Sequence, residues 1–211
     1  MKDEIPEGDV LLHAGDFTNV GWPGEVKELN DILGQLPHKH KIVIAGNHDL
    51  TFDDEMLQND PEAFEKFGLN LEKVKTDLTS VGVNSAKELL TNCLYLEDAC
   101  VELYGIKIHG SPWQPEFCDW GFNLPRGQPC LSKWDLIPCD TDILITHGPP
   151  LEIARRLQIP RSTITSVVDR YRKRGSVENI PRKGKQAKLS DRDSRSILRL
   201  VKKTERENYQ I

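Results

Sequence analysis

Four side chains of this sequence have the chemistry to bind a metal ion or to move a proton, and each follows a short apolar run. They are Asp16, Asn47, His48 and His147. Carboxylate and amide oxygens together with imidazole nitrogen suit Mn, Fe, Zn or Mg, whereas thiolate sites need cysteine. A carboxylate such as Asp16 can also bridge two cations, because both of its oxygens have lone pairs. These residue types predict a site for a divalent metal, with Mn, Fe, Zn or Mg as the candidates.

Each of these side chains has an expected role. Asp16, Asn47 and His147 supply ligands, whereas His48, next to Asn47, faces the substrate and protonates a leaving oxygen or stabilises phosphoryl charge. We expect Asp49 to hold the other ring nitrogen of His48. Two metals about 3.5–4 Å apart would clamp a phosphate ester and lower the pKa of a bound water. The alternative for each motif is structural, since Gly-Asp is commonly a turn and His147 can be a hydrogen-bonded histidine at a strand end.

Three apolar runs must position these side chains. They are residues 10–14, 41–45 and 142–146. Runs of four or five aliphatic residues that stop at a small or polar residue are typical of buried strands in an α/β sheet. The ligand site of such a sheet lies beyond the carboxyl ends of its strands. We therefore expect the metal-binding side chains to meet at one rim.

The intervening segments complete an α/β pattern. The spacing of Val26, Leu29 and Leu33 predicts a helix over residues 24–33. Alternation of apolar and polar residues predicts strands at 92–96, 100–103 and 106–109, the last two joined by a Tyr-Gly turn. The acidic stretch 54–86 carries no chemical motif, and we interpret it as a surface segment rather than a cap over the site.

An aromatic-rich loop follows the last of these strands. It contains Trp113, Trp120, Asn123 and Arg126, which could stack a nucleobase and pair with phosphate. The alternative is that Trp113 and Trp120 simply cover the sheet. We name the four residues as candidate substrate-binding residues.

The composition narrows the class of protein. The chain has 211 residues, a net charge of −5 and 37% hydrophobic residues, enough for one sizeable core and a small second unit. No run approaches the ~18 apolar residues of a membrane span, and the acidic N-terminus lacks a signal pattern. Five cysteines without paired metal spacing indicate reduced thiols that pack or lie on the surface. We expect a cytoplasmic protein without a membrane partner, with the nucleus as the alternative location.

Charge divides the chain near residue 150. Residues 151–211 hold 17 Lys or Arg and 7 Asp or Glu, a net charge of +10, which leaves −15 for residues 1–150. An asymmetry of this size indicates two segments with different partners. We predict one domain over residues 1–150 and a second over 151–211.

The first segment resembles a known family. The stretches GDVLLHAGDFT, KIVIAGNHDLTFD, GSPWQPEFCDWGFNLPRG and TDILITHGPP look like those of the calcineurin-like metallophosphoesterases, and most closely the small metallophosphoesterase-domain-containing proteins of animals. The resemblance implies a β-sandwich with flanking helices that hydrolyses nucleotide-type phosphodiesters with a metal-activated water. It also implies that Asp16 bridges two metals, that Asn47 and His147 bind the second, and that His48 is the catalytic acid.

The chain departs from that family pattern at two points. No Asp-x-His precedes Asp16, and no Gly-rich, His-containing motif follows residue 150. We therefore expect a truncated sandwich that lacks the first and last motifs, keeps one metal site of two and has impaired activity.

The second segment has the pattern of a small all-α helix-turn-helix unit. A helix ends near residue 157, Pro160 breaks it, and residues 161–174 open a second helix. The stretch IARRLQIPRSTITSVVDRYRKRGSVENIPRKGKQAKLSDRDSRSILRLVKK resembles the N-terminal DNA-binding region of mariner-type transposases. The residues expected to contact DNA are Arg161, Ser162, Thr163, Thr165, Arg170, Lys173 and Arg174. The alternatives are an ordinary basic helical hairpin and docking of the basic segment on the acidic one. The sequence thus supports two hypotheses, a phosphodiesterase and a DNA-binding fusion without a transposase catalytic domain.

Overall fold

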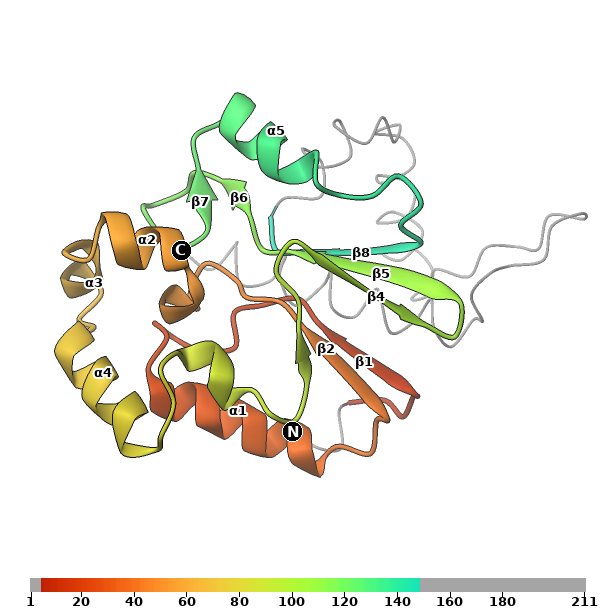
Figure 1. Ribbon diagram of the computed structural model, residues 1–211, viewed down its shortest axis with the longest axis horizontal. Coiled ribbons are helices and arrows are strands. Elements are labelled where there is room, and N and C mark those ends of the chain that lie inside the picture. Colours follow the sequence, from red (N-terminus) through yellow and green to blue (C-terminus); the bar gives the residue numbers. More distant parts are fainter. Residues whose placement is uncertain (1–4, 149–211) are drawn as a thin grey trace, which may run out of the picture.

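The computed structural model describes residues 5–148 of the chain, and Figure 1 shows how their elements are arranged. The predicted helix-turn-helix unit lies outside the described residues, as do its DNA-contacting residues between Arg161 and Arg174. The strands are β1 Val10–His13, β2 His40–Val43, β3 Leu94–Tyr95, β4 Ala99–Leu103, β5 Ile106–Ser111, β6 Gln114–Pro115, β7 Asn123–Leu124 and β8 Ile143–Thr146. The helices are α1 Pro23–Gln35, α2 Asp54–Asn59, α3 Ala63–Lys66, α4 Leu71–Ser80 and α5 Gln128–Trp134, with 3-10 turns η2 Leu50–Phe52 and η3 Ala86–Leu89.

Two three-stranded sheets form the centre of the molecule. The first has the order β1-β2-β3 with all strands parallel. The second has the order β4-β5-β8, in which β4 runs antiparallel to β5 and β8 runs parallel to it. A short parallel pair, β6-β7, closes the aromatic loop. The strands predicted at 100–103 and 106–109 are confirmed as the hairpin β4-β5.

The two sheets pack face to face as a sandwich. Leu12 and Ile42 of the first sheet meet Ile108 and Ile145 of the second, and each of these side chains is at most 5% exposed. The two layers approach closely at Gly110, because a Cβ there would lie 2.6 Å from side-chain atoms of Ile44 and Leu96. Burial of each aliphatic side chain is worth roughly 1.5–3 kcal/mol, so this apolar layer holds the sheets together. The α/β fold expected from the sequence is confirmed.

Helices cover both outer faces of the sandwich. Helix α1 buries Val26 and Leu33 on the first sheet, where Leu33 packs with Val43. Helix α5 buries Cys130 and Trp134 over Leu144 of the second sheet. Figure 1 shows the resulting order of α1, first sheet, second sheet and α5. No helix within residues 5–148 is long and apolar enough to cross a membrane.

The acidic stretch after β2 is more structured than the sequence indicates. Its helices enclose a separate small core in which Phe64, Leu69, Val74 and Leu78 pack with Leu50. Residues 54–86 thus form a largely exposed surface segment, as interpreted, with a small core that the sequence did not indicate. The helical spacing of these apolar residues is interrupted by short turns, which hides their common core from a reading of the sequence.

Candidate functional site

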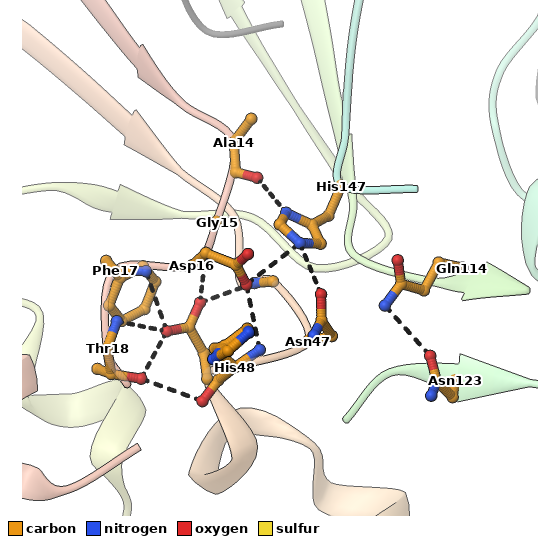
Figure 2. Close-up of polar contacts among 12 residues, drawn as sticks. Ala14, Gly15, Asp16, Phe17, Thr18, Asn47, His48, Gln114, Asn123 and His147 are labelled. Atoms are coloured by element: carbon orange, nitrogen blue, oxygen red, sulfur yellow. Dashed lines mark hydrogen bonds and ion pairs between the residues drawn. The ribbon is translucent and has the colours of Figure 1, made fainter. Parts of the chain in front are cut away.

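Three of the predicted ligands converge where strands of both sheets end. Asp16 follows β1, Asn47 follows β2 and His147 follows β8. The Nε2 atom of His147 lies 3.1 Å from Asp16 Oδ1 and 2.9 Å from Asn47 Oδ1. Figure 2 shows the three side chains pointing toward one another. The rim is shared by the two sheets, since β1 and β2 belong to one sheet and β8 to the other.

Two glycines let the loops at this rim approach each other. Gly15 has φ +92°, and a Cβ there would lie 2.4 Å from the backbone nitrogen of Gly46. A Cβ on Gly46 would lie 2.3 Å from Asp16 Oδ1 and 2.6 Å from His147 Cε1. Such distances exclude any larger residue without rearrangement, so each glycine is required by the close approach of the two loops that carry the predicted ligands. Asp16 itself has φ +54°, a strained backbone conformation that the surrounding contacts must maintain.

The hydrogen bonds of His147 fix which nitrogen faces the oxygens. Nδ1 lies 2.7 Å from the Ala14 carbonyl, which can only accept, so Nδ1 carries a proton and donates it. In the neutral ring Nε2 then has a lone pair that faces the Asp16 and Asn47 oxygens. Burial opposes charge on both partners, yet the pKa of His147 is raised by Asp16, and the pKa of Asp16 is lowered by His147. The three converging lone pairs thus favour a cation between them, either a proton on Nε2 or a metal ion.

The same geometry fits one divalent cation. Neighbouring ligand atoms of an octahedral ion with bonds of about 2.1 Å lie about 3.0 Å apart, close to the two distances measured here. The Nδ1–H bond to the Ala14 carbonyl is the outer contact that metal-binding histidines usually make. Within residues 5–148, no group of three or more His, Cys, Asp or Glu side chains is placed to hold a metal. With the Asn47 amide oxygen beside Asp16 and His147, the residues at the rim have the chemistry to hold a single divalent ion.

His48 lies beside this centre and is held by two contacts. Its Nδ1–H donates to the Asn19 carbonyl at 2.8 Å, and its ring stacks on Trp120 with centroids 4.1 Å apart and an angle of 29° between planes. Nε2 is then the ring nitrogen that can serve a substrate. The prediction that Asp49 holds the ring of His48 is wrong, because the Asn19 carbonyl occupies that position.

Asp49 instead ties together the two loops that carry the ligands. Its carboxylate accepts backbone N–H bonds from Gly46, Asp16, Phe17 and Thr18 at 2.7–3.2 Å, and the Thr18 hydroxyl at 2.7 Å. Burial raises the pKa of Asp49 to about 6, in opposition to the hydrogen bonds from Gly46 and Thr18, and the charge of Asp16 adds to the rise. Asp49 therefore holds Asp16 in its strained backbone conformation.

Sequence reasoning missed the residues that position His48. Glu25, in the first turn of α1, accepts hydrogen bonds from the backbone and side-chain amides of Asn19 and from the backbone N–H of Trp22. This contact fixes the loop whose carbonyl holds His48. The sequence does contain a signal for this contact. An acidic residue in the first turn of a helix that begins at a proline commonly accepts hydrogen bonds from the backbone amides just before the helix.

The candidate substrate-binding residues are only partly brought together. Trp113, Trp120 and Asn123 line a pocket of about 390 Å³, whereas Arg126 is exposed and is not among its lining residues. The Asn123 amide donates to the Phe117 carbonyl at 2.8 Å and accepts from Gln114 at 3.1 Å. In Figure 2 the contact between Gln114 and Asn123 lies apart from the predicted metal ligands. A role for these residues in substrate binding stays a prediction.

The two tryptophans are engaged by the protein itself. Trp113 is 3% exposed, its indole N–H donates to Asp98 at 2.7 Å, and the ammonium of Lys133 lies 3.9 Å from its ring centre. Trp120 contacts Phe67 as well as His48. The pocket is also rich in acid, with Asp53, Glu55, Asp60, Glu116 and Asp119 among its lining residues. It therefore suits a neutral or cationic part of a ligand rather than a phosphate group.

The sequence is similar to known proteins over most of its length. The sequence pattern of the calcineurin-like phosphoesterases matches residues 2–177. Human metallophosphoesterase domain-containing protein 1 is 53% identical over 148 residues, which are 70% of this chain and 44% of that protein. A UPF0046 protein of Caenorhabditis elegans is 49% identical over 152 residues, or 70% of this chain and 38% of its own length.

A more distant match involves a larger protein. A protein of Emericella nidulans named probable rhamnogalacturonate lyase C is 34% identical over 154 residues, which are 71% of this chain and 13% of that protein. The chain spans less than half the length of the curated relatives described here. The family match continues past residue 150, where charge predicts a domain boundary, and that boundary stays a prediction.

Proposed function

The chain belongs to the calcineurin-like phosphoesterase family, and on this premise we propose that it is a metal-dependent phosphodiesterase. The proposal includes hydrolysis of small phosphodiesters, with nucleotide-type esters as the substrates implied by the sequence resemblance. The observation that carries it is the approach of Asp16 Oδ1 and Asn47 Oδ1 to His147 Nε2, at 3.1 and 2.9 Å.

In this proposal Asp16, Asn47 and His147 hold one divalent cation, of the kind that this family generally uses. When bound, such an ion polarises the phosphoryl oxygen and makes a water molecule acidic enough to attack near neutral pH. Its identity among Mn, Fe, Zn and Mg is left open by the ligand set, because oxygen and imidazole ligands serve all four.

The remaining residues act on the substrate or hold the ligands. His48 presents Nε2 to the reacting phosphate, where it protonates the leaving oxygen or stabilises the developing charge. Asp49 keeps the Asp16 loop against the Asn47 loop through its backbone contacts. The pocket lined by Trp113, Trp120 and Asn123 receives an ester arm, and Trp120 connects it to His48 by direct stacking.

The test is hydrolysis of bis(4-nitrophenyl) phosphate by the purified chain, loaded in turn with Mn²⁺, Zn²⁺ and Mg²⁺. We expect metal-stimulated turnover that falls at least about 100-fold in Asp16→Asn, because even a residue behind a metal ligand contributes 10–100-fold. Asp31→Asn is the matched control, since it removes a carboxylate from an exposed ion pair on α1. Well-folded protein without metal-stimulated turnover would contradict the proposal.

A second candidate function rests on residues 151–211. Their net charge of +10 and their resemblance to a transposase helix-turn-helix favour binding of DNA through the positions from Arg161 to Arg174. Each Lys or Arg contact to phosphate should add about −0.9 to the slope of log affinity against log salt. Failure of the full chain to shift any duplex at low salt would dismiss this candidate.

A further inference from the structure

Cys100 and His109 form a pair on the second sheet, away from the loops that carry the metal-binding residues. They lie directly opposite each other in the β4-β5 hairpin. Their neighbours Val101 and Ile108 pack into the sandwich core, so the alternation of strand side chains puts Cys100 and His109 on the outer face. Cys100 Sγ lies 3.1 Å from His109 Nδ1, within the range of a hydrogen bond to sulfur.

The two partners differ in exposure. Cys100 is exposed on β4, the edge strand in the order β4-β5-β8. His109 is 1% exposed, and its Nε2 is buried without a hydrogen-bond partner. Solvent therefore reaches the sulfur while the imidazole stays fixed behind it, an arrangement that allows a reagent to approach only the thiol.

The unpartnered nitrogen indicates which tautomer of His109 is present. A proton on Nε2 would leave a buried N–H donor unsatisfied, whereas a proton on Nδ1 leaves only a lone pair without a partner. Orphaned buried donors are rarer than orphaned acceptors, so the proton belongs on Nδ1. Nδ1–H then donates to the Cys100 sulfur, and an N–H donor stabilises a thiolate more than a thiol.

Charged groups surround the Cys100–His109 pair. Glu102 and Lys107 are the next opposite residues on the same face, and the ammonium of Lys107 pairs with the Asp140 carboxylate. Burial lowers the pKa of His109, with Asp98 acting in the opposite direction, which favours the neutral ring. A neutral imidazole with a fixed Nδ1–H is thus the group that faces the sulfur.

We propose that Cys100 is an activated thiol, positioned by His109, and a modification site for small soft electrophiles. In the reaction with iodoacetamide, the thiol proton passes to solvent, the sulfur forms a bond to the CH₂ carbon, the carbon–iodine bond breaks and iodide leaves. The inference is independent of phosphodiester hydrolysis, because it uses none of the metal-binding residues.

The chain provides its own reference thiols for the test. Cys118 and Cys139 are also exposed, whereas Cys130 is 2% exposed. Alkylation of the full chain by limiting iodoacetamide at pH 7, followed by mass spectrometry of each cysteine peptide, gives the relative rates. We expect Cys100 to react about tenfold faster than Cys118 and Cys139, because the His109 N–H beside its sulfur stabilises the negative charge that the attacking sulfur carries. Equal rates for the three exposed thiols would overturn the proposal.

Two variants separate positioning from simple exposure. His109→Leu removes the donor and should reduce the Cys100 rate to that of the reference thiols, whereas His109→Asn keeps an N–H near the position of Nδ1 and should retain part of the enhancement. Unchanged rates at Cys118 and Cys139, with Cys130 still protected, show that each variant is folded. A Cys100 rate that does not change in folded His109→Leu would also overturn the proposal.

Discussion

The rim that carries the proposed metal ligands Asp16, Asn47 and His147 differs in construction from the aromatic pocket beside it. At the rim, each predicted ligand comes within four residues of the end of a strand, and glycines and the Asp49 carboxylate fix the backbone there. In the pocket, Trp113 and Asn123 are engaged by Asp98 and by Phe117 and Gln114. The rim side chains are therefore placed by backbone position, whereas the pocket side chains mainly hold their own loop together.

This contrast explains what the sequence could and could not predict. Asp16, Asn47 and His147 were identified because strand ends of an α/β fold meet at one rim, so a local pattern predicted a distant contact. The partner of His48 was missed because it is the backbone carbonyl of Asn19, and no residue type identifies a carbonyl. The core of residues 54–86 was missed because its apolar residues lie on several short helices.

The largest expected effect is the loss of stability on substitution of Asp49. Asp49→Ala leaves four buried or half-buried backbone N–H groups without their acceptor, while the Thr18 hydroxyl keeps only its weaker contact with the His48 carbonyl at 3.2 Å. We expect the free energy of unfolding to fall by about 3–5 kcal/mol, because unsatisfied buried donors cost about 1–3 kcal/mol each and some regain water. Urea unfolding measures the change, and Asp31→Ala, on the surface, should shift stability by less than about 0.5 kcal/mol. A loss below 1 kcal/mol in Asp49→Ala would show that the rim is not held in this way.

A smaller effect, on metal affinity, is expected from substitution of Gly46, where the loops that carry Asp16 and Asn47 meet. The added methyl group of Gly46→Ala meets Asp16 Oδ1 and His147 Cε1, so we expect metal affinity to fall about 10–100-fold, as for other changes behind a metal site. Gly24→Ala is the matched control, because a Cβ at Gly24 meets nothing within 4 Å. Isothermal titration with Mn²⁺ compares the two variants. Equal affinity in both would mean that the closeness of the loops does not matter for the ion.

Trp120 contacts both the rim and the pocket, and its substitution is expected to reduce kcat by less than the loss of metal affinity at Gly46. Trp120→Ala removes the ring stacked on His48, so we expect kcat to fall about tenfold on an alkyl phosphodiester, where the leaving oxygen needs a proton. The loss should be smaller on bis(4-nitrophenyl) phosphate, whose leaving group is stable without one. Trp120→Phe keeps a stacking ring and should retain most activity. An equal loss on both substrates would assign Trp120 to packing alone.

The smallest effect is expected at Asn123. Asn123→Ala loses two hydrogen bonds of a half-buried amide, so thermal unfolding should show a loss of about 1 kcal/mol. KM should change less than about twofold, because in this account the amide supports the loop. A large rise in KM with unchanged stability would instead make Asn123 a direct substrate contact, and the contrast between rim and pocket would weaken.

Equilibrium dialysis of the chain against Mn²⁺, followed by elemental analysis, tests the central claim most directly. We predict one ion per chain, lost in His147→Gln and retained in His40→Gln, a histidine on β2 outside the rim. An ion that stays bound in folded His147→Gln, or a folded wild-type chain that binds none, would contradict the assignment of Asp16, Asn47 and His147 as a metal centre.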